Sequence, residues 1–173
     1  MTDETTTTSL KPRQKPLEAA EVDINHRSPF LCDLRIGDGV LSDGIAHVSN
    51  IEYLRWVDRA AQLHADSLGY TRAHLVDSGV MWFVARHEID YMAEVWPGDR
   101  LVLATWVRNM KRVKSWRDYV IYRPSDEMIV CRAATLWVLI DLATRRPTRI
   151  PDEMIRRFDP LHPSKAPSKC TLP

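Results

Sequence analysis

The sequence predicts an α+β fold in which a curved antiparallel sheet of about five strands wraps around one long central helix. A single long segment has the 3.6-residue periodicity of an α-helix and is apolar over most of its circumference. The segments after it are rich in β-branched and aromatic residues and are joined by short turns. Short connections favour antiparallel neighbours, and a helix that is apolar over so much of its surface needs a whole sheet to bury it.

The amino-acid composition excludes some classes of binding partner. The 173 residues include 24 Lys and Arg and 23 Asp and Glu, so the formal net charge is +1. Such a chain has no general electrostatic field for a nucleic acid or an anionic membrane, and it lacks the apolar run of about 18 residues that a membrane span requires. The first residues are threonine-rich and acidic, unlike the start of a secretory signal. We therefore expect a cytoplasmic protein without nucleic-acid or membrane partners.

The two ends of the chain differ from its centre. Residues 1–28 contain no aromatic side chain and few large aliphatic ones, so they bury too little apolar surface to offset the entropy of ordering them. Residues 160–173 are punctuated by prolines among lysine and serine. Both ends are expected to be flexible tails, and residues 29–159 are expected to form one domain of ordinary size.

The long helix is predicted at Ile51–Leu68, after a strand at Phe30–Ile36. Ser49 and Glu52 have the spacing of a capping box, and Gly69 suits the left-handed residue that ends many helices. Polar residues at spacings of three and four leave an apolar stripe on the other side of the helix. This stripe comprises Ile51, Leu54, Val57, Ala61, Ala65 and Leu68, and the side chains of Tyr53, Trp56, Ala60 and Leu63 widen it.

The remaining strands follow the helix. Val80–Met92 alternates with period two, and its odd positions are mainly apolar, which predicts a strand buried on one face. A Pro-Gly-Asp turn ends this segment. Further strands are predicted at Leu101–Arg108, Ser115–Arg123 and Ile129–Asp141, and a short helix at Asp152–Phe158.

The segment before the helix contains a recurring motif, an aspartate followed after three residues by His-Val-x-Asn-x-x-Tyr. In this chain its residues are Asp43, His47, Val48, Asn50 and Tyr53. The motif, followed by Arg-Trp, a long helix and strands, resembles the hotdog-fold thioesterases of the 4-hydroxybenzoyl-CoA thioesterase type. Further matches stand at 97–99, 111–116 and 144–147, so the resemblance covers about residues 36–151.

This resemblance implies the hotdog fold and the hydrolysis of an acyl-CoA thioester to the free acid and CoA. Because CoA is then part of the substrate, no separate cofactor is expected. Hotdog domains of this type pair their sheets, so the resemblance also implies a homodimer or homotetramer with active sites between subunits. Such pairing protects the edge and the outer face that a sheet with only one helix leaves exposed.

Asp43 is the candidate catalytic carboxylate. It lies shortly before the helix, whose first amides have no partner within the helix and favour negative charge. The backbone amides around Asn50 are therefore candidates for stabilising the thioester oxygen as it becomes negative. Asp43 acts either as a nucleophile that forms a mixed anhydride or as a general base on water. The alternative without a catalytic role is that the Asp-Gly pair only forms a turn.

Other polar residues of the motif and helix have competing interpretations. Asp58 is a rival carboxylate, although an edge ion pair with Arg55 or a hydrogen bond with Gln62 is preferred for it. His47 is expected to shape the loop or touch the thioester, since its spacing from the aspartate does not suit the acid–base pair of a dehydratase. Tyr53 either lines the substrate pocket or packs in the core, and packing is preferred.

No metal site is expected. The other histidines are scattered without the spacing of metal ligands. Cys32, Cys131 and Cys170 are widely spaced and odd in number, which fits neither a disulfide framework nor a zinc site.

A basic cluster lies between two predicted strands, with no acidic residue between positions 108 and 117. Such a run is usually a solvated turn. In the resemblance, however, this junction meets the nucleotide end of CoA, whose phosphates require fixed cations. A nucleic acid is disfavoured by the neutral total charge and the lack of interleaved exposed aromatic residues. The cluster comprises Arg108, Lys111, Arg112, Lys114 and Arg117, and the candidate CoA-binding residues are Arg112, Lys114 and Ser115.

Two other functions remain open at this point. An acyl carrier protein (ACP) thioester would use the same loop, and the basic cluster would then contact an acidic carrier protein. A non-catalytic acyl-CoA-binding hotdog module would need the pocket but not the carboxylate of Asp43.

Overall fold

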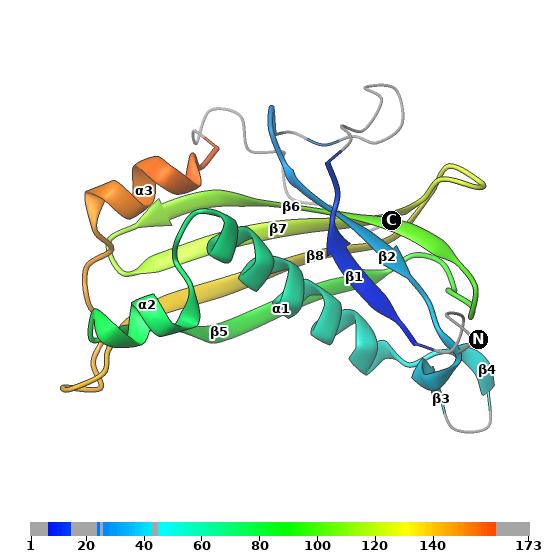
Figure 1. The fold of residues 1–173 in the computed structure, drawn as a ribbon, viewed down its shortest axis with the longest axis horizontal. Coiled ribbons are helices and arrows are strands. Elements are labelled where there is room, and N and C mark those ends of the chain that lie inside the picture. The colour runs from blue at the N-terminus through cyan, green and yellow to red at the C-terminus, as the bar shows by residue number, and fades with distance from the viewer. Residues whose placement is uncertain (1–6, 15–23, 25, 43–44, 162–173) are drawn as a thin grey trace.

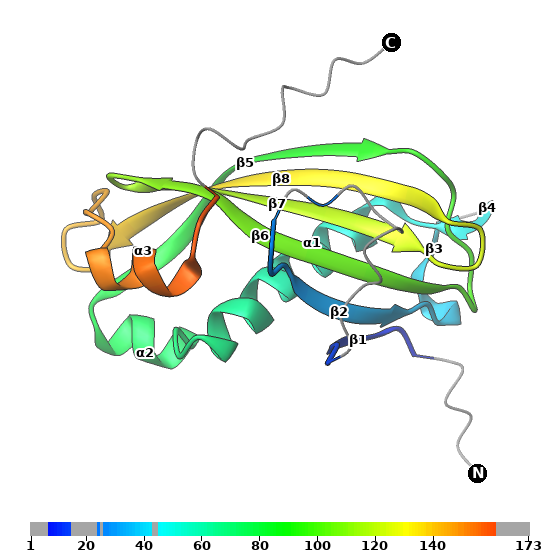
Figure 2. The same ribbon diagram turned by 90° about the horizontal axis from the view of Figure 1, so that it is seen from above.

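The computed structural model describes residues 7–14, 24, 26–42 and 45–161. Its main sheet curls around one long helix, α1 (Asn50–Ser67) (Figure 1, Figure 2). Leu41–Ser42 (β3) and Ile45–Val48 (β4), which follow a 3-10 turn at Asp38–Val40 (η1), form a second sheet just before α1. The main sheet has six antiparallel strands, in the order β1 (Ser9–Pro12), β2 (Phe30–Arg35), β6 (Arg100–Lys111), β7 (Lys114–Arg123), β8 (Met128–Asp141) and β5 (Val80–Tyr91).

The two ends of the main sheet carry different elements. At one end lie β3, β4, the start of α1 and the end of β5 (Figure 1, Figure 2). At the other end lie α2 (Arg72–Asp77), α3 (Asp152–Phe158) and the hairpin between β6 and β7. The described residues of the motif and the basic cluster therefore lie at opposite ends of the main sheet within one chain.

The predicted α+β arrangement of one central helix and a curved antiparallel sheet is confirmed. The predicted strands and the long helix match the observed elements, and α3 has the predicted bounds. The sequence prediction missed β1, which lies inside the range expected to be a flexible tail. Ser9–Pro12 pair with β2, and Leu10 packs against the main core, so the expectation of a tail is corrected at these residues. Four residues with one apolar anchor give too weak a pattern to be recognised without their partner strand.

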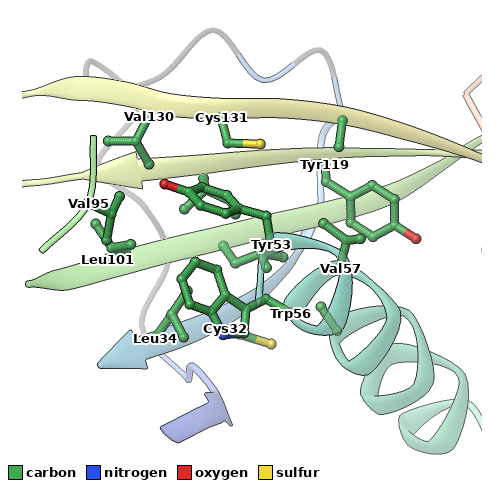
Figure 3. Close-up of a cluster of buried hydrophobic side chains, with 14 of the residues drawn as sticks. Cys32, Leu34, Tyr53, Trp56, Val57, Val95, Leu101, Tyr119, Val130 and Cys131 are labelled. Atoms are coloured by element: carbon green, nitrogen blue, oxygen red, sulfur yellow. The ribbon is translucent and has the colours of Figure 1, made fainter. Parts of the chain in front are cut away.

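The buried face of α1 is centred on aromatic residues. Figure 3 shows Tyr53 and Trp56 between α1 and the sheet, with ring centroids 4.9 Å apart. Ile51, which was predicted to belong to the central apolar stripe, is instead 55% exposed. The largest side chains determine which face of the helix turns inward, because they bury the most apolar area. The buried residues of α1 are Tyr53, Trp56, Val57, Ala60 and Ala61.

The predicted start of α1 is wrong in its capping, whereas its predicted end is confirmed. Ser49 is the N-cap residue, but its side chain makes no capping hydrogen bond, and the Glu52 carboxylate pairs with Arg55 instead. The predicted capping box is therefore wrong. At the other end Gly69 has φ 86°, and the amides of Gly69 and Tyr70 donate to the carbonyls of Asp66 and Ala65 at 3.0 and 2.9 Å. This is the Schellman ending that the glycine predicted.

β5 is an edge strand rather than a strand buried on one face. A register shift between Val84 and Arg86 interrupts its pairing with β8, and such a bulge breaks the alternation of inward and outward side chains. Phe83 and Val84 are 45% and 40% exposed. The prediction of one uniformly buried face is thus wrong for the middle of this strand.

A polar pair of a buried arginine and a partly buried histidine joins α1 to β7. The Arg117 Nη1 atom lies 2.9 Å from His64 Nδ1. Because a guanidinium only donates, the histidine nitrogen accepts, and the imidazole is neutral. Burial, together with the positive charge of Arg117, lowers the pKa of His64 to about 3. The folded state therefore contains a histidine that stays neutral in mild acid.

This pair predicts a specific acid sensitivity. In the unfolded chain His64 takes up a proton near pH 6.5, whereas in the folded chain it does so only near pH 3. Between these values the unfolded state binds more protons, so the free energy of unfolding falls as the pH falls. His64→Asn retains an acceptor for Arg117 but cannot titrate. Its melting temperature should fall less than that of the wild type between about pH 6.5 and pH 4, and parallel thermal-unfolding curves would contradict the assignment.

Candidate active site at the start of the central helix

A cavity of about 370 Å³ lies where β4, the start of α1 and the end of β5 meet. It is the site to which the sequence motif points, because three of the predicted residues line it together. Asp43, the predicted catalytic carboxylate, lies outside the described residues, as does Gly44. The lining residues are His47, Val48, Asn50, Tyr53, Tyr91, Met92, Ala93 and Glu94.

His47 lies on β4, which is held in place by backbone hydrogen bonds. The Val48 amide donates to the Val95 carbonyl at 3.0 Å, and the Ser49 amide donates to the Val40 carbonyl at 2.9 Å. The His47 ring contacts the Trp96 ring edge to face, with centroids 6.5 Å apart. Its Nδ1 atom is buried and has no hydrogen-bond partner among the described residues. The ring is thus fixed by packing, and one polar atom is left unpaired beside the cavity.

Asn50 is the first residue of α1, and its side chain is exposed. Within the described part of the chain, neither its amide nor that of Ile51 has a hydrogen-bond acceptor. The Ser49 hydroxyl accepts from no helix amide, so it does not cap Ile51, the second helical residue, while the Glu52 amide donates to the Ser49 carbonyl at 3.0 Å. Free amides at a helix start favour a negatively charged oxygen.

Tyr53 combines the two interpretations that the sequence left open. Its side chain is buried in the main core, and it also lines the cavity. Its ring packs edge to face against Tyr91, with centroids 5.2 Å apart. Burial raises the pKa of Tyr53 above its ordinary value, so the phenol stays protonated. The Tyr91 hydroxyl donates to the Asn50 carbonyl at 3.3 Å.

The sequence motif did not reveal the residues that β5 and its following loop bring to the cavity. Tyr91, Met92, Ala93 and Glu94 come from the end of β5, far from Asn50 in sequence. Only the pairing of β5 with β8 directs this end toward the start of α1. A signal did exist, since Tyr91 and Met92 are large apolar residues just before a predicted turn. Glu94 adds a described carboxylate to the cavity.

The basic cluster does not join this cavity within one chain. Arg112, with φ 59°, and Lys114 are exposed in the β6–β7 hairpin at the other end of the sheet. Arg108 forms a two-pronged ion pair with Asp118, in which the Nε–Oδ2 distance is 2.9 Å. Arg117 is buried. Only Lys111, Arg112 and Lys114 therefore present free positive charge at the hairpin.

Ser115 and Asp58 line a second cavity, between the C-terminal half of α1 and the sheet. Ser115 is buried, whereas the side chains of Arg112 and Lys114 are exposed. The structure therefore does not place these three candidate residues in one site. The preferred interpretation of Asp58 is wrong, because its expected partners are engaged elsewhere. Arg55 pairs with Glu52, and the side-chain oxygen of Gln62 accepts from Arg59 at 3.1 Å.

Other chemistry can be stated for the described residues alone. They contain no group of three or more His, Cys, Asp and Glu side chains placed to hold a metal ion. Cys32 and Cys131 are buried free thiols, and burial raises the pKa of both to about 12. Cys170 lies outside the described residues. No helix in the described ranges is long and apolar enough to cross a membrane.

Solved structures share the fold. A 1,4-dihydroxy-2-naphthoyl-CoA thioesterase from Synechocystis superposes with a TM-score of 0.70 and 21% identity, over 79% of this chain and 100% of that one. A Staphylococcus aureus protein solved in complex with CoA superposes with a TM-score of 0.72 and 13% identity, over 84% of this chain and 96% of that one. The hotdog fold implied by the motif is thereby confirmed.

Sequence comparisons identify the family. The chain is 30% identical over 111 residues to a chloroplastic acyl-[acyl-carrier-protein] hydrolase of Cuphea viscosissima, a match covering 63% of this chain and 26% of the relative. It is 25% identical over 161 residues to an oleoyl-acyl carrier protein thioesterase of Coriandrum sativum, covering 79% and 43%. The chain thus spans less than half the length of either relative. Residues 42–158 match the family model of the acyl-ACP thioesterase N-terminal domain, and the chain therefore belongs to the acyl-ACP thioesterase family.

Proposed function

We propose that this protein hydrolyses an acyl thioester to a free acid and a thiol, with the acyl group carried by ACP. The observation that carries the proposal is the family match over residues 42–158, which includes the motif and the cavity at the start of α1. The sequence motif alone favoured acyl-CoA and left acyl-ACP as the alternative. Family membership reverses that order, because the relatives are named for ACP thioesters.

The proposed chemistry uses two parts of the motif. The carboxylate of Asp43 either attacks the thioester carbonyl and expels the thiolate, giving a mixed anhydride that water hydrolyses, or takes a proton from a water molecule that attacks the carbonyl and expels the thiolate directly. The amides of Asn50 and Ile51 stabilise the carbonyl oxygen as it becomes negative. The lack of a side-chain cap from Ser49 supports the second part for Ile51, whose amide such a cap could otherwise occupy. His47 borders the same cavity with an unpaired Nδ1, which suits a residue that contacts the thioester or shapes its pocket.

Acyl-CoA is the second candidate donor, because the exposed hairpin cations are compatible with it. Lys111, Arg112 and Lys114 suit the phosphates of CoA as well as an acidic carrier protein. The decisive assay measures kcat/KM for acyl-ACP and acyl-CoA donors with the same acyl groups. A higher value for ACP is expected, a higher value for CoA would reassign the carrier, and binding without turnover of either donor would leave a non-catalytic module.

Arg112 provides a test of how the carrier is bound. Arg112→Ala should raise KM for CoA thioesters and for acyl-ACP more than for short acyl-pantetheine analogues, because only the first two offer phosphates or acidic side chains to the hairpin. A several-fold change is expected for one exposed charge. Arg145→Ala, which removes an exposed arginine from another turn, serves as the matched control. Equal effects on all three donors would remove Arg112 from the carrier-binding surface.

We also infer a homodimer that pairs the β5 strands of two copies. β5 is a long edge strand with exposed apolar side chains, a surface that natural sheets normally cover. It begins at the hairpin end of the sheet and ends beside α1. Antiparallel pairing about a two-fold axis would therefore bring the hairpin of one copy toward the α1 cavity of the other. This would reunite the hairpin cations with the motif across two subunits.

Phe83→Lys tests this interface. A lysine on the pairing strand should disfavour association, because each dimer would contain two buried like charges. Sedimentation velocity should show a shift from dimer toward monomer, with activity falling as the dimer dissociates. Val76→Lys is the matched control, since Val76 is 49% exposed on α2 and is not part of the β5 pairing edge. An unchanged dimer in the Phe83 variant would place the interface elsewhere.

A further inference from the structure

The second cavity, of about 110 Å³, shares no lining residue with the cavity at the start of α1. It lies at the α2 and α3 end of the sheet, beneath the C-terminal half of α1. Most of its wall is apolar, and Met81, Trp82 and Trp137 form the part contributed by β5 and β8. The charged side chains that line it are Asp58, Arg72 and Arg117. Positive charge therefore exceeds negative charge in this apolar cavity.

Arg117 is the unusual member of this wall. It is only 5% exposed, and no carboxylate among the described residues forms an ion pair with it. Asp118 cannot neutralise it, because side chains alternate along β7 and Asp118 pairs with Arg108 on the opposite face. A buried cation without a counter-charge is strongly unfavourable, so such groups are normally paired.

The neighbours of Arg117 position it without neutralising it. Its Nη1 atom contacts His64 Nδ1 at 2.9 Å and Thr105 Oγ1 at 3.3 Å. Its guanidinium carbon lies 5.6 Å from the centre of the Phe158 ring. These contacts use one of the three guanidinium nitrogens, and no acceptor for the other two is found in the part of the chain that the structure describes. The guanidinium therefore has donors left for a two-pronged bond to an anion.

We propose that this cavity binds the carboxylate of a small amphipathic acid, with Arg117 as its ion-pair partner and the tryptophan-lined wall around its apolar body. Two kinds of ligand could supply such a carboxylate. One is a free short-chain acid, and the other is a dicarboxylic acyl group, whose second carboxylate lies at the end away from the thioester. A planar carboxylate matches the paired donors of a guanidinium. Trp82 and Met81 offer contact area to the apolar part of the ligand. The inference concerns binding and does not depend on the proposed thioester hydrolysis.

The test uses hexanoate and its uncharged analogue hexanamide as probes. Trp82 and Trp137 line the cavity, so binding is measured by the change in tryptophan fluorescence and by isothermal titration calorimetry. The wild type should bind hexanoate saturably and hexanamide about ten- to a hundredfold more weakly, the range for hydrogen bonds to a charged group. Arg117→Met should bind hexanoate more weakly than the wild type by the same factor, and Arg117→Lys should show a smaller loss of affinity. Arg100→Gln, which removes an exposed arginine at the other end of β6, should bind as the wild type does.

A second variant keeps the test decisive if the Arg117 variants do not fold. Ala65 lines the cavity from α1 and is only partly buried, so Ala65→Leu should fill space while leaving the guanidinium in place. It should weaken hexanoate binding, with an unchanged circular dichroism spectrum. Absence of hexanoate binding to the wild type, equal binding of hexanoate and hexanamide, or full binding by Ala65→Leu would each overturn the proposal.

Two further arms separate the sources of the carboxylate. If the ligand is the end of an acyl group, Arg117→Lys should raise KM selectively for an adipoyl thioester compared with an uncharged thioester of the same length. If the ligand is a free acid, KM should change equally for both thioesters, while hexanoate still binds the wild type. Either result supports the site when hexanoate binding depends on Arg117. If the wild type hydrolyses no thioester at all, the proposed function is refuted, but the result of the hexanoate-binding experiment still stands.

Discussion

Replacement of Asp43 by asparagine is expected to lower kcat for thioester hydrolysis by about 10²- to 10⁴-fold, the usual contribution of a positioned acid or base. Asparagine has nearly the same shape as aspartate, but it neither accepts a proton at neutral pH nor attacks a carbonyl. KM should change little, because the acyl group and its carrier are bound by other residues. Hydrolysis is followed through the released thiol, and a retained circular dichroism spectrum establishes that the fold is intact.

Other carboxylates provide the comparison for this variant. Glu94 lines the same cavity, and Asp58 lines the second one. Asp77→Asn is the neutral control, because Asp77 is exposed at the end of α2. Turnover that survives in Asp43→Asn but disappears in Glu94→Gln or Asp58→Asn would transfer the catalytic role to that carboxylate. Survival of turnover in all three candidate variants would exclude Asp43, Glu94 and Asp58 as the essential carboxylate.

Trp56→Ala is expected to have the largest effect on stability, lowering the free energy of unfolding by about 3–5 kcal/mol. Trp56 is 4% exposed and belongs to the core cluster between α1 and the sheet (Figure 3). Truncation removes its apolar contacts and leaves a cavity next to Tyr53, whose ring centroid lies 4.9 Å away. Because Tyr53 also lines the candidate active site, we expect weaker substrate binding as well. Chemical denaturation measures the stability loss.

Ile51→Ala is the matched control on the same helix. Ile51 is apolar but 55% exposed, so its truncation should change the free energy of unfolding by no more than about 0.5 kcal/mol. Equal losses in the two variants would mean that the buried face of α1 differs from the one described. A small loss for Trp56→Ala would mean that the helix contributes little to holding the sheet.

The repeating patterns of the chain were sufficient to predict its main elements. The 3.6-residue period of α1 arises from side chains that meet one buried surface. β6, β7 and β8 are runs rich in β-branched and aromatic residues between turns, so all four elements can be recognised within their own segments. β1 and the β3–β4 pair are too short to show a period. β5 shows one, but the bulge at Val84 and its position at the sheet edge change which side chains are buried.

The candidate site was predicted in part for the same reason. His47, Asn50 and Tyr53 lie close together in sequence and remain together around one cavity. Tyr91 and Glu94 join them only because β5 runs antiparallel to β8 and ends beside α1. No local sequence pattern predicts this contact, because the residues are far apart in the chain.

The amino-acid sequence alone was enough to identify the helix, most strands and the motif before α1, because each of these is a local pattern. Only the tertiary structure decided how the charges are used. Arg108, Arg112 and Arg117 look alike in one basic run, yet the first pairs with Asp118, the second is exposed and the third is buried beside His64. The physical reason is that Arg108 on β6 and Arg117 on β7 point to opposite faces of the curled sheet, while Arg112 lies in the hairpin between the two strands. That separation leaves a cation inside an apolar cavity.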